Sequence, residues 1–198
     1  MIVALAGGAA YLLVAVISLT LANAGDSVSP IWLPNACAAA FLLRLRLRSE
    51  LPFLFACFAA GLASNIVQQL PVHIALLFSA ANVAEIAAVL VIARSAAQVQ
   101  PDMTRLADLA RFVWAGGLIG PLISAVIAAP GMGDSIEQVR AGAVTWFLTD
   151  SMAMVLVVPT ILLLADRMRG PAASALGRPI EKAALLSAGM ACAFLVFN

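Results

Sequence analysis

The sequence predicts an all-α membrane protein, a polytopic bundle of transmembrane helices, and three observations support this prediction. Of the 198 residues, 64% are hydrophobic and only 11% are charged, whereas about a quarter of an average soluble domain is charged. Long apolar runs recur along the chain, most of them near the roughly 20 residues that a helix needs to cross the hydrocarbon core. Period-two alternation is nowhere sustained, which argues against a transmembrane barrel.

Seven segments qualify as spans in a single integral membrane domain over residues 1–198. The second is weak because it contains Pro30 and Pro34, and the seventh stays apolar up to the last residue. Loops are too short for a soluble module, and a net charge of +1 gives no field that would hold nucleic acid. The expected spans cover approximately residues 2–22, 28–43, 51–70, 72–93, 112–129, 141–165 and 183–197.

The distribution of Lys and Arg predicts the orientation of these spans. Basic residues gather in cytoplasmic loops, and all of the eleven except Arg140 fall in three alternate loops, which contain Arg46, Arg105 and Arg169. The amino terminus is therefore expected in the cytoplasm. After seven spans the carboxyl end would lie outside in an apolar run, so we expect a fragment or a missing eighth helix.

The first span has an alternative interpretation as a secretory signal peptide. Ala22-Asn23-Ala24 has the small-residue pattern of a cleavage site. Against this, the apolar run is longer than usual and no Lys or Arg precedes it. Both interpretations predict the same topology, because the next helix enters from outside in either case.

The connector between the fourth and fifth spans also has two interpretations. Residues 101–108 have the pattern of a short amphipathic interfacial helix that leads into the fifth span. A solvated connector explains the same residues equally well.

Motifs of soluble enzymes are absent from the sequence. It contains no phosphate-binding loop, no paired His at helical spacing, no CxxC and no nucleophile elbow. The three cysteines stand alone in apolar runs, and the single His73 lies at the start of a span, where an interfacial role is simpler than metal ligation. We therefore expect no catalytic site, no metal and no cofactor.

Two acids inside the spans are the strongest candidates for a functional site, because an ionised group at mid-membrane costs roughly 2.5–3.5 kcal/mol. Glu85 shares a helical face with Asn82, and Asp150 follows Trp146 by one turn. At 1.5 Å per residue their depths differ by about 6 Å, so they can meet if their helices are neighbours. No Lys or Arg lies in any span, so a shared proton is expected. A structural interhelical hydrogen bond and a sensing, ligand or ion site remain the two alternatives.

Other polar and kinking residues are expected near the outer ends of the spans. Asn65 belongs to a polar stripe with Ser64, Gln68 and Gln69, which would face the bundle or a shallow outer vestibule, with simple interfacial solvation as the alternative. Trp32, Pro34 and Asn35 are expected to line an outer mouth near the Trp146 and Asp150 turn, because both groups start spans that run inward. Pro34, Pro121 and Pro159 are expected to kink or break their spans.

Taken in order, these motifs resemble the first type of bacterial membrane-associated sensor domain, the MASE family. The resemblance rests on Ser29-Pro30-Ile31-Trp32-Leu33-Pro34-Asn35-Ala36, on Asn82-Val83-Ala84-Glu85, on Pro121-Leu122-Ile123-Ser124-Ala125, and on Trp146-Phe147-Leu148-Thr149-Asp150 before Pro159. It covers nearly the whole chain.

The resemblance implies a sensory input module of about eight helices in the bacterial inner membrane. It would relay a stimulus to a histidine kinase, a diguanylate cyclase or a cyclic-di-GMP phosphodiesterase, and none of these domains is present. Expected partners are the lipid bilayer, an output domain in cis or on another protein, a second copy of the chain and a small ligand. The alternative function is a small proton- or ion-coupled transporter or a transporter subunit.

Overall fold

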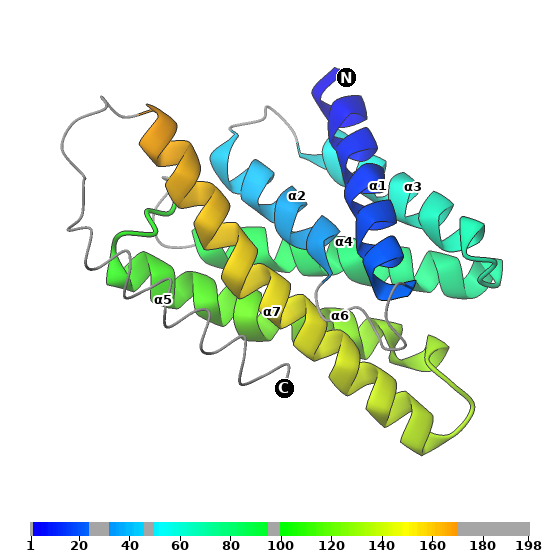
Figure 1. Ribbon diagram of the computed structural model, residues 1–198. Coiled ribbons are helices and arrows are strands. Elements are labelled where there is room, and N and C mark those ends of the chain that lie inside the picture. Colours follow the sequence, from blue (N-terminus) through cyan, green and yellow to red (C-terminus); the bar gives the residue numbers. More distant parts are fainter. Residues whose placement is uncertain (1, 24–31, 46–49, 95–99, 170–198) are drawn as a thin grey trace. The chain divides into compact units, whose positions relative to one another are not determined.

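Every regular element in the described part of the chain is helical, which confirms the all-α prediction (Figure 1). The computed structural model describes residues 2–23, 32–45, 50–94 and 100–169. Two short segments are π- and 3-10 helices, labelled η1 and η2. In chain order the elements are α1 (Ile2–Asn23), α2 (Leu33–Arg44), α3 (Leu51–Val67), α4 (Val72–Arg94), α5 (Leu106–Trp114), η1 (Ala115–Ile119), α6 (Gly120–Ala128), η2 (Ala129–Gly131) and α7 (Ile136–Arg169).

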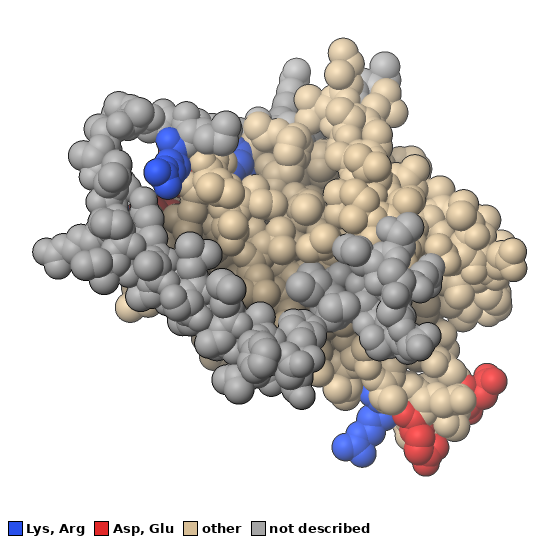
Figure 2. Space-filling model, in the orientation of Figure 1, with Lys and Arg blue, Asp and Glu red and all other residues tan. Residues whose placement is uncertain are grey.

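Four helical segments among the described residues are long and apolar enough to cross a membrane. They are Ile2–Leu19, Val72–Arg94, Leu106–Gly131 and Ile136–Arg167, while α3 is apolar but shorter. The seventh expected span lies outside the described residues. Uncharged side chains dominate the described surface in Figure 2, and charged ones gather at two separate places.

The second expected span is helical from Leu33 to Arg44, which is only 12 residues. Pro34 lies in the first turn of this helix, where the missing N–H has no intrahelical partner to lose. The expectation that Pro34 kinks or breaks a span was therefore wrong, because this proline begins a helix.

The chain divides into two units, Met1–Leu164 and Ala165–Asn198. In the first unit, α4 contacts α2, α3, α5, η1 and α6, and α1 packs on α2 and α3. Small residues permit the close approach of α1 and α3, since a Cβ on Gly8 would lie 3.0 Å from the Ala56 Cβ. Of the second unit, the structure describes the last residues of α7.

The fifth span is continuous from α5 through η1 to α6 rather than broken at Pro121. The Gly120 N–H bonds to the Ala115 carbonyl five residues back, which is the π-helical pattern. This wider turn directly precedes Pro121, whose nitrogen has no hydrogen to donate. It also brings Gly120 against α4, where its added Cβ would lie 2.7 Å from Val89 Cγ2 and 3.4 Å from Glu85 Cγ.

The sixth span, α7, continues past its internal Pro159, so this proline does not end it. The neighbouring Thr160 hydroxyl donates to the Leu156 carbonyl at 2.6 Å, a bond common where a membrane helix accommodates a proline. Ala153, Met154, Val158 and Leu162 of this helix lie in the hydrophobic core.

The connector before α5 is a turn, and α5 begins only at Leu106. The Asp102 carboxylate accepts hydrogen bonds from the Thr104 hydroxyl at 2.7 Å and from its backbone N–H at 2.9 Å. These bonds hold the pKa of Asp102 below its ordinary value. The alternative of an amphipathic helix over residues 101–108 was wrong for 101–105, because this local bonding favours a turn.

Candidate functional site: a buried polar network

A chain of hydrogen bonds centred on Asn35 links three helices in the interior. The Tyr11 hydroxyl on α1 donates to Asn35 Oδ1 at 2.7 Å. Asn35 Nδ2 donates in turn to Asn82 Oδ1 at 3.0 Å and to Glu85 Oε2 at 2.5 Å, both on α4. All four side chains are buried. The first turn of α2, opened by Pro34, thus places an amide between α1 and α4.

The network continues from α4 to α7 through the two intramembrane acids. The carboxyl groups of Glu85 and Asp150 interact directly, and the two residues are only 0% and 2% exposed. Glu85 Oε1 and Asp150 Oδ2 are buried and receive no hydrogen bond from any described residue. Two acceptors therefore lie in one interior site without a donor between them.

Trp146 extends the site to α6. It lies one turn before Asp150 and interacts with its carboxyl group, while its indole Nε1 donates to Ser124 Oγ at 2.9 Å. The ring packs against Phe78 of α4, with centroids 4.9 Å apart and planes at 57°. The indole is thereby held between α4, α6 and α7, beside the acids.

The remaining predicted site residues occupy different places. Trp32 is half-buried beside the Tyr11 hydroxyl, but its Nε1 makes no hydrogen bond to a described residue. Asn65 donates to the Ala75 carbonyl at 3.4 Å and to Ser79 Oγ at 3.3 Å, which joins α3 to α4. The structure thus joins Asn35 to Asp150 through Glu85, while Asn65 bonds to other groups.

For Gln68 and Gln69 the expectation that the polar stripe on α3 faces the bundle was wrong, and their exposure agrees with the alternative of interfacial solvation. The helix ends at Val67, and Gln68 and Gln69 lie exposed in the following turn, where Gln69 has a φ of 62°. His73 is also exposed at the start of α4. Among the described residues, no cluster of three His, Cys, Asp or Glu side chains could hold a metal ion.

Tyr11 and Ser124 are network members that the sequence analysis missed. Tyr11 is the only tyrosine of the chain and lies within an apolar span, where a buried hydroxyl needs a partner. That signal was available in the sequence. Ser124 had no such signal, because a serine in a membrane helix commonly bonds its own backbone.

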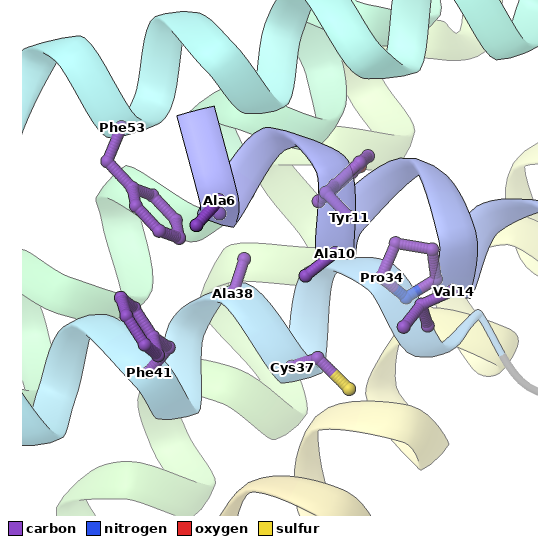
Figure 3. A pocket seen from close by; sticks show the side chains of 10 residues that line it. Ala6, Ala10, Tyr11, Val14, Pro34, Cys37, Ala38, Phe41 and Phe53 are labelled. Atoms are coloured by element: carbon purple, nitrogen blue, oxygen red, sulfur yellow. The ribbon is translucent and has the colours of Figure 1, made fainter. Parts of the chain in front are cut away.

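An apolar cavity of about 240 Å³ adjoins the network at Tyr11 and Pro34. Figure 3 shows side chains of α1, α2 and α3 around it. The Tyr11 ring therefore faces the cavity while its hydroxyl bonds to Asn35. Its other lining residues are Ala6, Gly7, Ala10, Val14, Cys37, Ala38, Phe41 and Phe53.

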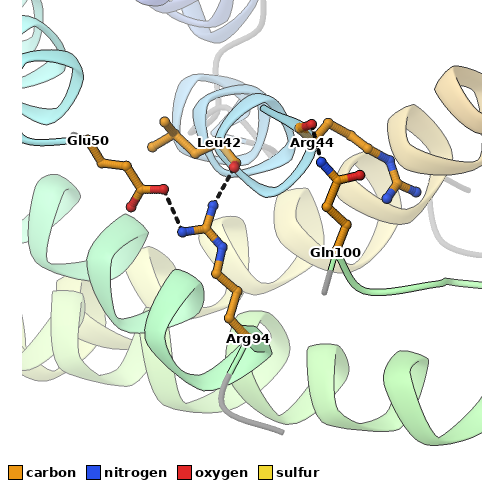
Figure 4. A network of polar contacts seen from close by, with 5 residues as sticks. All are labelled: Leu42, Arg44, Glu50, Arg94 and Gln100. Atoms are coloured by element: carbon orange, nitrogen blue, oxygen red, sulfur yellow. Dashed lines mark hydrogen bonds and ion pairs between the residues drawn. The ribbon is translucent and has the colours of Figure 1, made fainter. Parts of the chain in front are cut away.

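A second polar network satisfies the carbonyls at the end of α2 (Figure 4). Arg94 forms an ion pair with Glu50 at 2.5 Å and donates to the Leu42 carbonyl. Gln100 Nε2 donates to the Arg44 carbonyl at 2.5 Å. The last carbonyls of a helix have no intrahelical donor, so these side chains supply one.

The Arg44 side chain joins this helix end to α7. It is only 8% exposed, and its guanidinium donates to the Pro101 carbonyl at 3.2 Å and to the Leu162 carbonyl at 3.3 Å. Both ends of α2 therefore contact the rest of the bundle through polar groups, Asn35 at one end and Arg44 at the other.

Comparison with known proteins supports the resemblance found in the sequence. No curated protein and no solved structure gives a significant match to the chain. The MASE1 family model, in contrast, matches residues 1–197. This match spans nearly the whole chain and includes every residue of the buried network. The chain therefore belongs to the MASE1 family, and it is a membrane-embedded sensor domain.

Proposed function

We propose that this chain is the input domain of a bacterial receptor and relays a stimulus to a cytoplasmic signalling domain, in cis or on a partner protein. The observation that carries the proposal is the buried network of Tyr11, Asn35, Glu85, Asp150 and Trp146. It joins α1, α2, α4 and α7 through polar side chains in the interior of a sensor-family chain. Buried polar groups in a membrane are costly unless they serve packing or function.

The mechanism we propose is a shift between two packings of these helices. A stimulus that alters one partner of the network changes the relative stability of the two packings. Arg44 of α2 bonds to the Leu162 carbonyl of α7. A movement of α7 at Asp150 would therefore also displace the end of α2. Kinase, cyclase or phosphodiesterase activity would report the result.

The topology belongs to the same proposal: seven spans in the inner membrane, with the amino terminus in the cytoplasm. Lys and Arg gather in three alternate loops, which supports this orientation. Arg105 and Glu137 are exposed and fall on opposite sides in this topology. In intact cells an impermeant thiol reagent should label Glu137→Cys and not Arg105→Cys. The reverse labelling would overturn the orientation.

A proton- or ion-coupled transporter is the second candidate, and the buried acids Glu85 and Asp150 favour it. Reconstituted vesicles separate the two functions. The sensor proposal predicts no proton or ion flux above empty vesicles, together with a kinase, cyclase or phosphodiesterase whose activity depends on this chain. Substrate-driven flux would contradict it. The reading frame beyond Asn198 is the first place to look for that output domain.

A further inference from the structure

We infer that Glu85 and Asp150 share one proton, and that this proton is the ligand which holds α4 and α7 together at the buried site. The inference deepens the proposed function, because it names what occupies the sensory site. Its evidence is two buried acceptor atoms and the adjacency of the two carboxyl groups. Glu85 Oε1 and Asp150 Oδ2 are both buried acceptors that receive no hydrogen bond from a described residue, and the two carboxyl groups interact directly.

Among the described residues, no cation acts on the two carboxyl groups that would let both acids stay ionised. Of the described residues, those that act on the two carboxyl groups are the acids themselves, Asn35 and Trp146. The other titratable groups facing the site are Tyr11 on α1 and, beyond it, Cys57 on α3, and both are neutral when protonated. Two adjacent carboxylates in a low-dielectric interior repel strongly.

A single proton resolves both problems. It removes one of the two negative charges and provides the missing donor between two acceptors, so the pair titrates as a unit. One proton suffices because Glu85 Oε2 already accepts from Asn35 Nδ2. A metal ion is a poorer occupant, because the described residues offer no third carboxylate, His or Cys ligand at the pair.

Loss of the proton would leave two facing anions on α4 and α7. The direct result is repulsion between these helices at a level where Gly120 packs against Glu85 and Trp146 lies beside Asp150. The site would therefore respond to a change in the protonation of the pair. The proton moves between the carboxyl pair and water, and no other bond changes.

Infrared spectroscopy of the whole chain in lipid tests the inference directly, because a protonated carboxyl group has a C=O stretch that shifts in D₂O. The expected result at neutral pH is one protonated carboxyl per molecule, lost in Glu85→Gln and in Asp150→Asn. Both amides retain the shape of the acid, and Gln at position 85 can still accept from Asn35 and donate to Asp150. Glu137→Gln, an exposed acid on α7, is the control and should keep the band.

Absence of a protonated carboxyl band from the folded wild-type protein would overturn the inference, as would a band that persists in both amide variants. If one variant does not insert, the other still decides, since each removes one half of the pair. A different outcome would refute the proposed function and leave the shared proton in place. A band present in the wild type, with no effect of either amide on the output domain, would leave the shared proton and refute its sensory role.

Discussion

Replacement of Asn35 by Ala tests whether the network stabilises the bundle. The change removes three hydrogen bonds and takes the Asn35 partner away from the Tyr11 hydroxyl, Asn82 Oδ1 and Glu85 Oε2. Interhelical hydrogen bonds in membrane proteins average about 0.6 kcal/mol, so three bonds contribute about 2 kcal/mol. Leaving a buried polar group without a partner adds about 1–3 kcal/mol, so we expect a loss of about 3–5 kcal/mol.

The assay is reversible unfolding of the purified chain in mixed micelles, followed by circular dichroism. Asn65→Ala is the matched control, because Asn65 is half-buried on α3 and makes two longer bonds of 3.3 and 3.4 Å. It should lose less than about 1 kcal/mol. Equal losses in the two variants would refute the reasoning that Asn35 organises the interior.

A double-mutant cycle separates the bond from the substitution. Tyr11→Phe removes the hydroxyl that donates to Asn35 Oδ1 and keeps the ring against the cavity. Combined with Asn35→Ala, its effect should fall short of the sum of the single effects by about 0.6 kcal/mol, the typical value of one such bond. Strict additivity would show that the two side chains do not interact in the membrane.

Two further predictions concern the π turn and the connector. Gly120→Ala should destabilise the bundle by about 1–3 kcal/mol in the same unfolding assay, because the added Cβ would lie 2.7 Å from Val89 Cγ2. Gly61→Ala meets only ordinary contacts at 3.5 Å or more and should show no loss; equal losses would contradict the account of close packing. Thr104→Val removes one donor to Asp102 and should raise its pKa toward the ordinary value, as measured by carboxyl NMR. The ionised Asp102 stabilises the turn fully at pH values above the ordinary pKa of an aspartate, and this stabilisation is lost as the pH falls through the lowered pKa of Asp102. An unchanged pKa in Thr104→Val would contradict the role given to the Thr104 hydroxyl.

The fold class could be predicted from composition and apolar run length, because both directly reflect the demands of the bilayer. Helix lengths were harder to predict. Residues 28–43 are apolar enough to suggest a span, yet α2 begins only at Leu33, because a proline is tolerated best in a first turn. The π turn before Pro121 has no composition signal, since it is a tertiary accommodation of the proline against α4.

The acids of the site were predictable because buried charge in a membrane is costly, and helix geometry placed their depths close enough for contact, about 6 Å apart. The hydrogen-bond partners of these acids were harder to predict from the sequence. Nothing in the sequence indicates that Asn35 bonds both Tyr11 and Glu85, because these residues lie 24 and 50 positions away. Helix adjacency decides such contacts, and it depends on close approach at residues such as Gly8 and Gly120.

The most direct test of the central claim, that the carboxyl pair sets the signalling state, is the basal activity of the output domain that works with this chain. It should be measured in native membranes for the wild type, Glu85→Gln, Asp150→Asn and the control Glu137→Gln, at matched expression. The account predicts that both amides at the buried pair shift the basal activity in the same direction, because neither variant can reach the doubly charged state that the wild type reaches when it loses the shared proton, while the control does not. Activity equal to the wild type in both buried variants would contradict the claim and make these acids structural only.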